Sequence, residues 1–406
     1  MGKELCLKPK NDFRKTMIDF LNKKEKKITK RALCVAGTAC LILLLGIACS
    51  QDTGEMKTID GVIHVLNPKK PPQGTVWLEV EKTLEINPYV HEQIGLKYFN
   101  FVRDNNGDVI LYHPNIVEAQ RFNSKGQYLG ALVRRGQGPG EFPDFSFFKV
   151  FFIEAKIIAT GNRKLARFDK SGLFLEEEIT GERSLDLVDE NSFITESSRP
   201  DEKAMSEKIV FVELPRAKDA QPSRTTLFEA AGVGMIKVKN GGFDDEYVTP
   251  NIRYAVDIAA KTIYLLHNKE YKIYVKSLKG DVLRVIEKPH RALGLNSKGR
   301  KKLLSKFKGG NLKSIEAAYP DKLVLIKDIK TLPRGWLAVY RITGAELFEI
   351  DVFDPEGKYR YILEPPQGIS LENAVFHDRG FALVEEKDDL LVYADYRIKN
   401  IPEIFE

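Results

Sequence analysis

The sequence holds few groupings of residues that could perform catalysis. Its histidines are widely spread, and no two lie closer than 22 residues apart. A zinc-protease motif needs two histidines four residues apart on one helix, so no local motif of that kind is present. A nucleophile elbow, a Walker phosphate-binding loop and a dinucleotide fingerprint are missing as well. We therefore assign no catalytic residue, no metal ligand and no cofactor from the sequence. A metal site assembled from residues far apart in the chain stays an open alternative. The histidines are His64, His91, His113, His267, His290 and His377.

The four cysteines all lie early, at Cys6, Cys34, Cys40 and Cys49. The rest of the chain has none, so it can contain neither a disulfide nor a cysteine-based metal site. A chain of 406 residues can bury a sizeable core without such cross-links.

Residues 104–108, Asp-Asn-Asn-Gly-Asp, begin like a calcium-binding loop. An EF-hand loop ends in a glutamate at its twelfth position, and this segment has no glutamate there. We therefore interpret it as a hairpin turn.

The segment 134–142, Arg-Arg-Gly-Gln-Gly-Pro-Gly-Glu-Phe, is the most distinctive motif. Three glycines and one proline within five residues predict a rigid, tightly folded loop. One interpretation is a turn between structural units in which Glu141 pairs with the two arginines, and we favour it. The other is a candidate ligand-binding site at a channel mouth, where an anionic ligand is held by Arg134, Arg135, Gln137 and Glu141.

A recurring motif indicates how the body that positions this loop is built. Each copy has an apolar run ending in Asp, Asn or Ser, a glycine three residues later and a second apolar run. The polar residue caps a turn and the glycine supplies its positive φ, so each copy predicts a β-hairpin. The copies lie at 121–129, 167–175 and 352–359, with a looser one at 276–283.

The spacing of these copies predicts the architecture. Their glycines, at 126, 172, 280 and 357, are separated by 46, 108 and 77 residues. One unit per ~45–55 residues fits a four-stranded propeller blade. Residues 75–406 are therefore predicted to form an all-β, six-bladed β-propeller of antiparallel blades, with five and seven blades as alternatives. The blades are expected at 97–136, 145–180, 186–230, 250–288, 320–366 and 372–398.

Two segments complete this plan. The last blade has room for about three strands, and residues 75–86 alternate in polarity, so we predict that they supply the missing strand and close the ring. Residues 289–318 are predicted to be a helical insertion capped by Ser297. Between His290 and Lys313 there are eight Lys or Arg and no Asp or Glu, which indicates either a solvated helix face, the favoured interpretation, or a contact with anionic lipid or an acidic partner.

The 134–142 motif resembles the R-x-G-x-G-P-G-E-[FY] signature of the bacterial six-bladed β-propeller lipoproteins, which are related to NHL-repeat proteins. Residues 59–68 resemble the lead-in of the same family, and with the repeats the resemblance covers roughly residues 59–400. The resemblance implies a propeller in the cell envelope that acts by binding, and it supplies no catalytic residues.

The N-terminal segment predicts where the protein resides. A basic stretch at 23–31 precedes a run without charge at 32–48, which is typical of a secretory signal or a short membrane anchor. Gly46-Ile47-Ala48-Cys49-Ser50 resembles a bacterial lipobox, which implies cleavage before Cys49 and lipidation of its thiol. An uncleaved anchor helix is the alternative, and translation could start at Met1 or Met17. We therefore divide the chain into a signal or anchor segment (1–49), a linker (50–74) and the propeller (75–406).

Charge and motifs together indicate the class of function. The first 48 residues hold 11 Lys or Arg against 4 Asp or Glu, whereas the rest of the chain is nearly neutral. The basic pI therefore gives no reason to expect nucleic-acid binding. We predict an envelope-anchored, monomeric, non-catalytic binding or scaffold module for a protein or small-molecule ligand, with the outer membrane weakly favoured. Two alternatives stay open: a lactonase-like hydrolase or lyase with an axial metal, and a sensor ectodomain on an uncleaved anchor.

Overall fold

Strands form nearly everywhere that apolar runs alternate with Asp, Asn or Gly turns in the sequence. The computed structural model describes residues 54–88, 99–113, 118–143, 148–161, 163–180, 186–200, 205–215, 221–231, 236–238, 241–307 and 312–405. The predicted anchor segment, residues 1–49, lies outside them. Within the described residues no helix is both long enough and apolar enough to cross a membrane.

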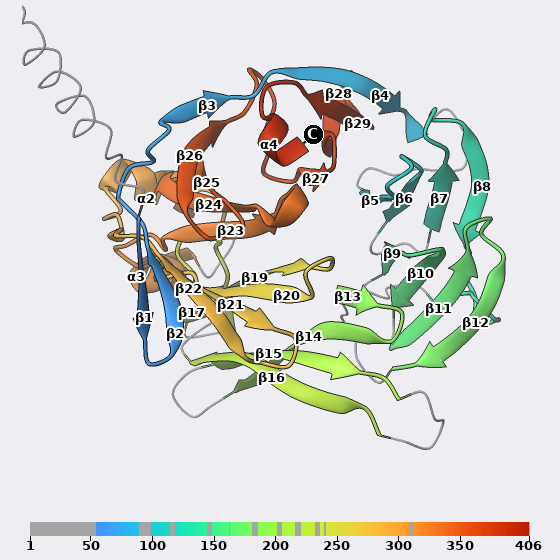
Figure 1. The fold of residues 1–406 in the computed structure, drawn as a ribbon, viewed down its shortest axis with the longest axis horizontal. Helices are drawn as coiled ribbons and strands as arrows, with labels where there is room; N and C mark the ends of the chain where they lie inside the picture. Colours follow the sequence, from blue (N-terminus) through green and yellow to red (C-terminus); the bar gives the residue numbers. More distant parts are fainter. Residues whose placement is uncertain are drawn as a thin grey trace, which may run out of the picture. The chain divides into compact units, whose positions relative to one another are not determined.

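Six sheets surround a central axis (Figure 1). In each sheet, consecutive strands of the chain pair antiparallel, and three of the sheets receive further strands from the N-terminal part of the described chain at their edge. This confirms the six-bladed propeller predicted from the repeats. The first three blades contain four strands each. Blade 1 consists of β5 (Asn100–Arg103), β6 (Val109–His113), β7 (Glu118–Phe122) and β8 (Tyr128–Val133). Blade 2 consists of β9 (Lys149–Ile153), β10 (Lys156–Gly161), β11 (Lys164–Asp169) and β12 (Phe174–Ile179). Blade 3 consists of β13 (Asp186–Asp189), β14 (Ser192–Pro200), β15 (Met205–Glu213) and β16 (Ser223–Ala231).

The remaining blades each receive strands from the N-terminal part of the described chain. Blade 4 consists of β19 (Ile252–Asp257), β20 (Thr262–His267), β21 (Lys272–Ser277) and β22 (Val282–Glu287), to which β2 (Val62–Leu66) and then β1 (Glu55–Ile59) are added. Blade 5 consists of β23 (Ile326–Thr331), β24 (Leu337–Gly344), β25 (Leu347–Phe353) and β26 (Tyr359–Glu364), with β3 (Thr75–Trp77) at its outer edge. Blade 6 consists of β27 (Val375–His377), β28 (Gly380–Lys387), β29 (Leu390–Ile398) and β4 (Val80–Ile86).

The ring closes through β4, the second part of the segment 75–86 that was predicted to close it, whereas the first part, β3, joins blade 5. Strand β4 pairs antiparallel with β29, and the register places Leu84 opposite Asp395 and Ile86 opposite Tyr393. Ile86 is buried in a cluster that also contains residues of blade 1. A strand from the start of the propeller therefore covers the last blade's open edge, which would otherwise be free to pair with another chain.

Burial between neighbouring blades holds the ring together. Six hydrophobic clusters each draw residues from two adjacent blades, so every blade packs on both of its faces. Phe193 of blade 3, for example, packs with Leu165 of blade 2, and Ile209 of blade 3 packs with Leu265 of blade 4. A single blade has no other surface on which to bury these side chains, which is why the repeated units assemble into a ring.

The hairpin turns form as the repeated motif predicts. The carboxylate of Asp354 accepts hydrogen bonds from the backbone N–H groups of Glu356 (3.0 Å) and Lys358 (2.9 Å). Gly357 follows with φ of 85°. A Cβ atom on this glycine would also lie 2.7 Å from Cγ1 of Ile286 in blade 4, so both its conformation and its packing require glycine.

The predicted linker at 50–74 is wrong for residues 55–66. These form the β1–β2 hairpin, and β2 pairs parallel with β22 at the edge of blade 4. The connecting residues Asp60 and Gly61 both have positive φ, 51° and 80°, which is the two-residue Asp-Gly turn that matches strand twist. The pair Asp60-Gly61, with apolar residues on both sides, therefore predicts a hairpin. This signal is stronger than the polar residues at 51–55, which favour a linker.

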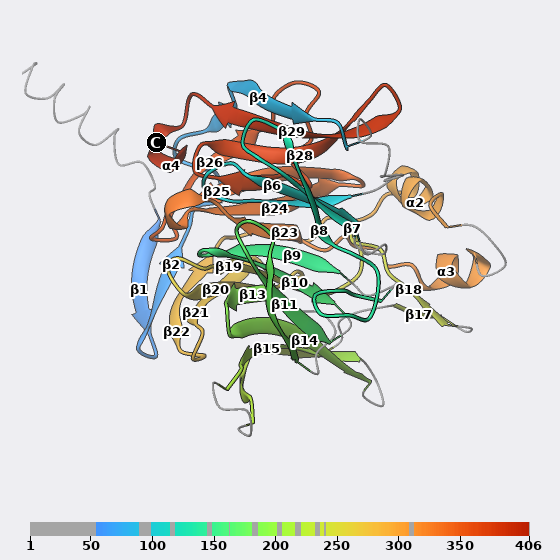
Figure 2. The ribbon, with the colours of Figure 1, turned by 90° about the vertical axis from the view of Figure 1, so that its right-hand side faces the viewer.

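The helical insertion at 289–318 is confirmed. It contains α2 (Ser297–Leu304) and α3 (Leu312–Ala318), which lie beside the short hairpin of β17 (Ile236–Val238) and β18 (Gly241–Phe243) (Figure 2). The predicted cap is wrong by one residue. Asn296 is the N-cap, because its side-chain oxygen accepts the N–H of Gly299 at 2.8 Å, and Ser297 is the first residue of the helix.

Short helical segments complete the ring. The 3₁₀ turn η2 (Pro333–Gly335) connects β23 to β24, and α4 (Pro402–Phe405) ends the described chain. Ile404 and Phe405 of α4 are buried in the cluster between blades 5 and 6.

Candidate functional site

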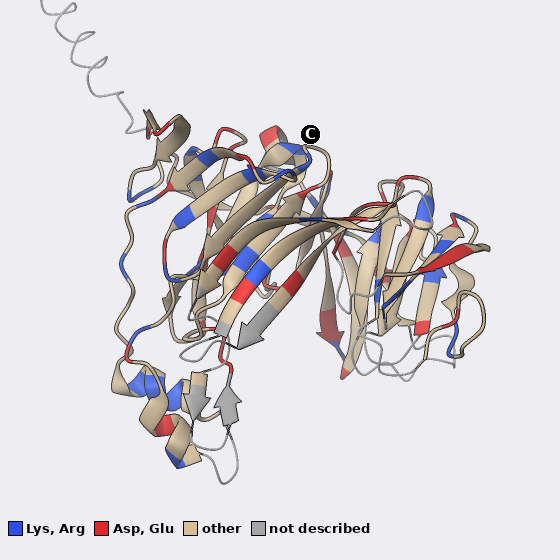
Figure 3. Ribbon diagram, turned by 90° about the horizontal axis from the view of Figure 1, so that it is seen from below, with Lys and Arg blue, Asp and Glu red and all other residues tan. Residues whose placement is uncertain are grey.

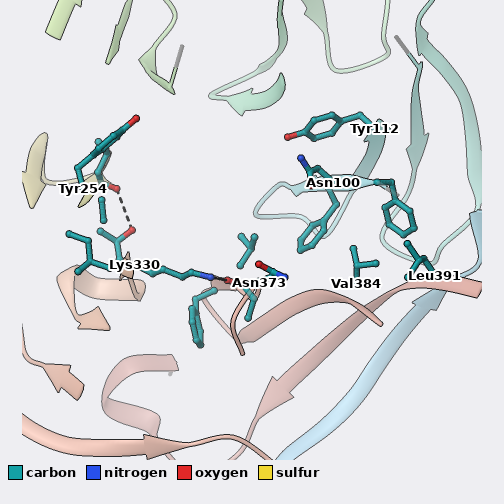
Figure 4. Close-up of a pocket in the computed structure, with 16 residues that line it drawn as sticks. Asn100, Tyr112, Tyr254, Lys330, Asn373, Val384 and Leu391 are labelled. Carbon is teal, nitrogen blue, oxygen red and sulfur yellow. Dashed lines mark hydrogen bonds between the residues drawn. The ribbon is translucent and has the colours of Figure 1, made fainter. Parts of the chain in front are cut away.

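A cavity of about 730 Å³ lies where the inner strands of blades 1, 4, 5 and 6 face one another (Figure 4). Most of its wall is apolar or aromatic, and a few polar groups interrupt it. Pockets of ~300–1,000 Å³ with this composition are typical of small-molecule sites. The lining residues are Phe99, Asn100, Phe101, Tyr112, Tyr254, Ala255, Val256, Ile329, Lys330, Thr331, Asn373, Ala374, Val375, Phe376, Val384 and Leu391.

Lys330 is the only ionisable amine among the residues that line this axial cavity. Its ammonium group donates to the backbone carbonyls of Glu372 (2.6 Å) and Ala374 (3.0 Å). Burial lowers the pKa of Lys330, although the carboxylates of Asp328 and Glu372 oppose that effect. An ammonium has three donors, so the two carbonyls take up two of them and fix its position.

Tyr254 is held at another part of the wall. Its hydroxyl donates to the carboxylate of Asp186, which also accepts a 2.7 Å hydrogen bond from Lys149. Burial, together with the negative charge of Asp186, raises the pKa of Tyr254. The phenol therefore stays neutral, and its position is fixed by blade 3 before any ligand arrives.

The residues of the axial cavity do not fit a metal held by carboxylates or imidazoles. None of the residues that line it is Asp, Glu or His. Across the described parts of the chain, no three His, Cys, Asp or Glu side chains come together in a group that could hold a metal ion. The donor set that an axial-metal lactonase needs is therefore not assembled in this cavity.

The two ends of the channel differ in charge. At one end, turns between the first and second strands of several blades line a larger cavity of about 1170 Å³. Acidic residues predominate in its wall, and Lys261 is its only basic residue. These acidic residues are Glu154, Asp189, Glu190, Glu213 and Asp378.

The other end carries mixed charge in a cavity of about 260 Å³. There Lys327 binds the carboxylates of Glu246 (3.1 Å) and Glu372, and its backbone carbonyl accepts from Arg253 (2.8 Å). Burial opposes the charge of Lys327, but the hydrogen bonds that it donates to Glu372, Tyr247 and Glu246 prevail and raise its pKa. This network holds the first residues of β23, the strand that also carries Lys330.

The loop at 134–142 lies outside the axial cavity. The carboxylate of Glu141 folds back onto its own loop and accepts the N–H of Gly138 at 2.9 Å. Lys164 of blade 2 donates to the carbonyls of Glu141 (2.9 Å) and Gly138 (3.3 Å). A Cβ on Gly136 would lie 2.0 Å from the Glu141 carboxylate, which explains why this position is glycine. The loop is thus a blade-to-blade connection closed by Glu141 and Lys164.

The other predicted site residues of this loop are exposed. Arg134, Arg135 and Gln137 lie on the surface, and none of them lines the axial cavity. Their role in holding an anionic ligand therefore stays a prediction, separate from the axial cavity. Cys49, the predicted lipidation site, lies outside the described residues.

The residues of the axial cavity carry no signal that marks them in the sequence. Lys330, Tyr254 and Asn100 belong to three different blades and share no local motif. The only usable signal was their position on first strands, since inner strands of a propeller face the axis.

The insertion carries its basic residues on the outside of the fold (Figure 3). Part of this charge is neutralised within the protein. Glu346 pairs with Lys302 (2.6 Å) and Lys306 (3.1 Å), and Arg300 pairs with Asp321 (3.0 Å). These pairs agree with the solvated helix face that the sequence analysis favoured.

Solved structures of other proteins resemble this chain at low sequence identity. No family model matches the chain, and no curated protein matches it. A crystal structure of a Bacteroides fragilis protein inferred to be exported is 13% identical with a TM-score of 0.44, covering 83% of this chain and all of that one. A member of the DUF4221 family from Bacteroides vulgatus is 11% identical with a TM-score of 0.44, over 79% of this chain and 99% of that one. A virginiamycin B lyase from Staphylococcus aureus is 10% identical with a TM-score of 0.35, over 79% of this chain and 100% of that one.

Proposed function

We propose that this protein is an extracytoplasmic, membrane-anchored binding module whose axial cavity binds a small organic ligand. The observation that carries the proposal is the combination of a cavity of about 730 Å³ with a single positioned ammonium group, that of Lys330. A ligand that fits has an apolar or aromatic body and a carboxylate, sulfonate or other acceptor directed at Lys330.

The wall supports binding rather than reaction. Phe101 and Tyr112 are buried and supply flat apolar surface, and Thr331 is held by a hydrogen bond to the carbonyl of Val256 (3.3 Å). Lys330 is the one lining group with a perturbed pKa that could act as a base, and two carbonyl contacts restrict its ammonium. A fixed donor in an apolar wall selects and orients a ligand without taking part in bond making.

The first test measures ligand binding at the axial cavity. The probe is 8-anilinonaphthalene-1-sulfonate, an aromatic anion whose fluorescence rises in an apolar site. Replacing Lys330 with methionine keeps the length of the side chain and removes the donor, so we expect affinity to fall roughly 10- to 100-fold, the size of one charge-assisted hydrogen bond. Lys125→Met removes the same charge from an exposed turn and should leave affinity unchanged.

A second variant makes that test independent of charge. Val375 lines the cavity and is 45% exposed, so a tryptophan there fills space without displacing the core. Val375→Trp is expected to abolish binding of both this dye and its neutral analogue N-phenyl-1-naphthylamine. Unchanged dye affinity in both Lys330→Met and Val375→Trp would show that the axial cavity is not the binding site.

The anchor is tested at the mature amino terminus. We expect mass spectrometry of protein purified from membranes to find a chain that begins at Cys49 with a diacylglyceryl group and an N-linked acyl chain. More than one acyl chain is needed for stable anchoring, because a single chain binds a membrane only marginally. Cys49→Ser should release the propeller from the membrane fraction or leave the precursor uncleaved. An intact Met1 or Met17 would instead support a sensor ectodomain on a retained anchor.

A further inference from the structure

A second, smaller cavity lies at the place where the ring closes. Its volume is about 160 Å³, and its wall joins the closing strand β4 and the strands of blade 6 to the turns of blade 1. It is separate from the axial cavity, since the two share no lining residue. The residues around it are Thr83, Leu84, Arg103, Asn106, Gly107, Ser124, His377, Arg379, Asp395 and Arg397.

Asp395 organises the inner part of this seam cavity. Its carboxylate accepts from Nε of Arg103 at 2.8 Å and from Nε2 of His377 at 3.0 Å. Burial would raise the pKa of Asp395, but the hydrogen bond from His377 and the positive charge of Arg103 outweigh it, so the pKa is lowered. The carboxylate is therefore ionised and holds one arginine and one imidazole in place.

The hydrogen bonds of His377 define its tautomer. Its Nδ1 accepts the backbone N–H of Arg379 at 3.3 Å, so its proton sits on Nε2 and points at Asp395. Both ring nitrogens are thereby engaged. The imidazole cannot also activate the nearby Ser124 hydroxyl, which argues against a serine-nucleophile triad at this site.

The charges of the wall do not balance. Three of the residues that line the cavity are arginines, Arg103, Arg379 and Arg397, whereas Asp395 is the only acidic one. Arg103 is only 14% exposed and is fixed by Asp395, while Arg379 and Arg397 are exposed at the rim. The wall therefore keeps an excess of two positive charges.

The acidic groups nearby are already engaged with other partners. The carboxylate of Asp104 accepts the backbone N–H groups of Asn106 and Asp108, both at 2.9 Å. Asp108 in turn accepts the N–H of Ser124 at 3.0 Å. Glu81, which faces Arg397 across the strand pair, binds Lys399 at 2.9 Å. The structure gives none of these three carboxylates an ion pair with Arg379 or Arg397.

We propose that this seam cavity binds a phosphate or sulfate group, with Arg379 and Arg397 holding its oxygens at the rim and Arg103 beneath them. The cavity, of about 160 Å³, has room for an oxyanion of this size. Guanidinium groups bind such oxygens with paired N–H donors. The hydroxyl of Ser124 and the amide of Asn106 add neutral donors to the same wall.

The position of this site gives it a structural consequence. Leu84 and Thr83 come from β4, Arg103 from blade 1, and Arg379 and Arg397 from blade 6. An anion that bridges these elements binds only when the ring is closed, so it stabilises the closed ring by mass action.

Calorimetric titration of the purified protein tests the proposal. Inorganic phosphate and inorganic sulfate are titrated at constant ionic strength with chloride as the background anion. We expect saturable binding with one site per chain and a rise in Tm with added oxyanion. The double variant Arg379→Met/Arg397→Met should lower the affinity at least tenfold, and the Arg379→Lys variant should lose less, because it keeps the charge but not the paired donors. Arg103 is left intact, because its removal would strand the buried Asp395.

The controls separate site, charge and source of the anion. Arg291→Met removes one exposed charge in the insertion and should bind as the wild type does. Lys330→Met should also leave oxyanion binding unchanged, and the double arginine variant should still bind the fluorescent dye. Methyl phosphate and vesicles containing phosphatidic acid distinguish a free ion or soluble ester from a lipid headgroup. The proposal would be overturned if none of these oxyanions showed saturable binding. It would also be overturned if the wild type and the double variant bound them with equal affinity.

Discussion

Replacing Asp351 with alanine is expected to lower the free energy of unfolding by about 3–5 kcal/mol, because it strands two cations in the core. Asp351 lies on β25 and is fully buried. Its carboxylate accepts from Lys288 at 2.6 Å and from Nε of Arg341 at 2.9 Å. The hydroxyls of Tyr271 and Tyr359 each donate to it at 2.6 Å.

The carboxylate of Asp351 compensates the charges of the two cations, Lys288 and Arg341. Burial alone would raise the pKa of Asp351, but the positive charges of Lys288 and Arg341 outweigh burial, so the pKa is lowered. Burial lowers the pKa of Lys288 to about 8, although Asp351 opposes the shift. The ammonium also lies 3.9 Å from the centre of the Tyr359 ring, so it has no access to water if the carboxylate is lost.

Urea unfolding followed by circular dichroism measures this prediction. The matched control is Glu349→Gln on the same strand, because Glu349 also pairs with Arg341 but is 37% exposed, and its loss should cost about 1 kcal/mol or less. The double variant Asp351→Ala/Lys288→Met should recover part of the loss, since it no longer buries an unpaired ammonium. Equal losses for Asp351→Ala and Glu349→Gln would show that the cluster does not depend on the buried carboxylate.

Much of the fold could be predicted because its determinants are local and repeated. The glycine of each hairpin turn, such as Gly126 with φ of 77° and Gly172 with φ of 83°, marks the same step between the third and fourth strands of a blade. The four copies fall in blades 1, 2, 4 and 5, and their spacing applied to the length of residues 75–406 gives six blades. The short sixth blade then requires a strand from elsewhere in the chain. The residues of alternating polarity at the start of the propeller supply it as β4.

Less of the functional site could be predicted, because it depends on contacts between blades. Lys330 is an ordinary lysine in the sequence, and only the carbonyls of Glu372 and Ala374 in the next blade define its direction. The seam cavity combines Arg103 with Arg397, nearly three hundred positions later in the chain. The loop at 134–142 was conspicuous for a different reason: its glycines allow Glu141 to fold back within the loop.

Residues 55–66 were predicted to be a linker because the strands that they form lack a clear pattern of polarity. Polar residues in β1 point to solvent, since the whole strand is exposed, and so they gave no alternation that a buried strand would show. Only Val65 of this hairpin is fully buried, and its side chain lies beside Gly357 in the β25–β26 turn of blade 5. An edge hairpin of this kind is added to a finished sheet and leaves little trace in the polarity of its sequence.

Replacing β4 with glycine and serine is the second change for which we expect a large effect. A Gly/Ser segment of equal length at 80–86 keeps the connection but removes Ile86 and Leu84 from the cluster between blades 6 and 1. Burial of two such side chains stabilises the fold by roughly 3–6 kcal/mol. It also leaves β29 as an unpaired edge, which favours association with a second chain.

The measurements are urea unfolding and size-exclusion chromatography, with β1 as the matched control. A Gly/Ser segment at 55–59 removes another strand from a sheet edge, but every residue of that strand is exposed, so we expect a loss of about 1 kcal/mol or less and an unchanged elution volume. A synthetic peptide of residues 78–88 should restore stability to the chain that lacks β4 and should not affect the one that lacks β1. If both replacements cost the same, ring closure through β4 adds nothing beyond the pairing of one more strand, and the six inter-blade clusters alone hold the propeller together.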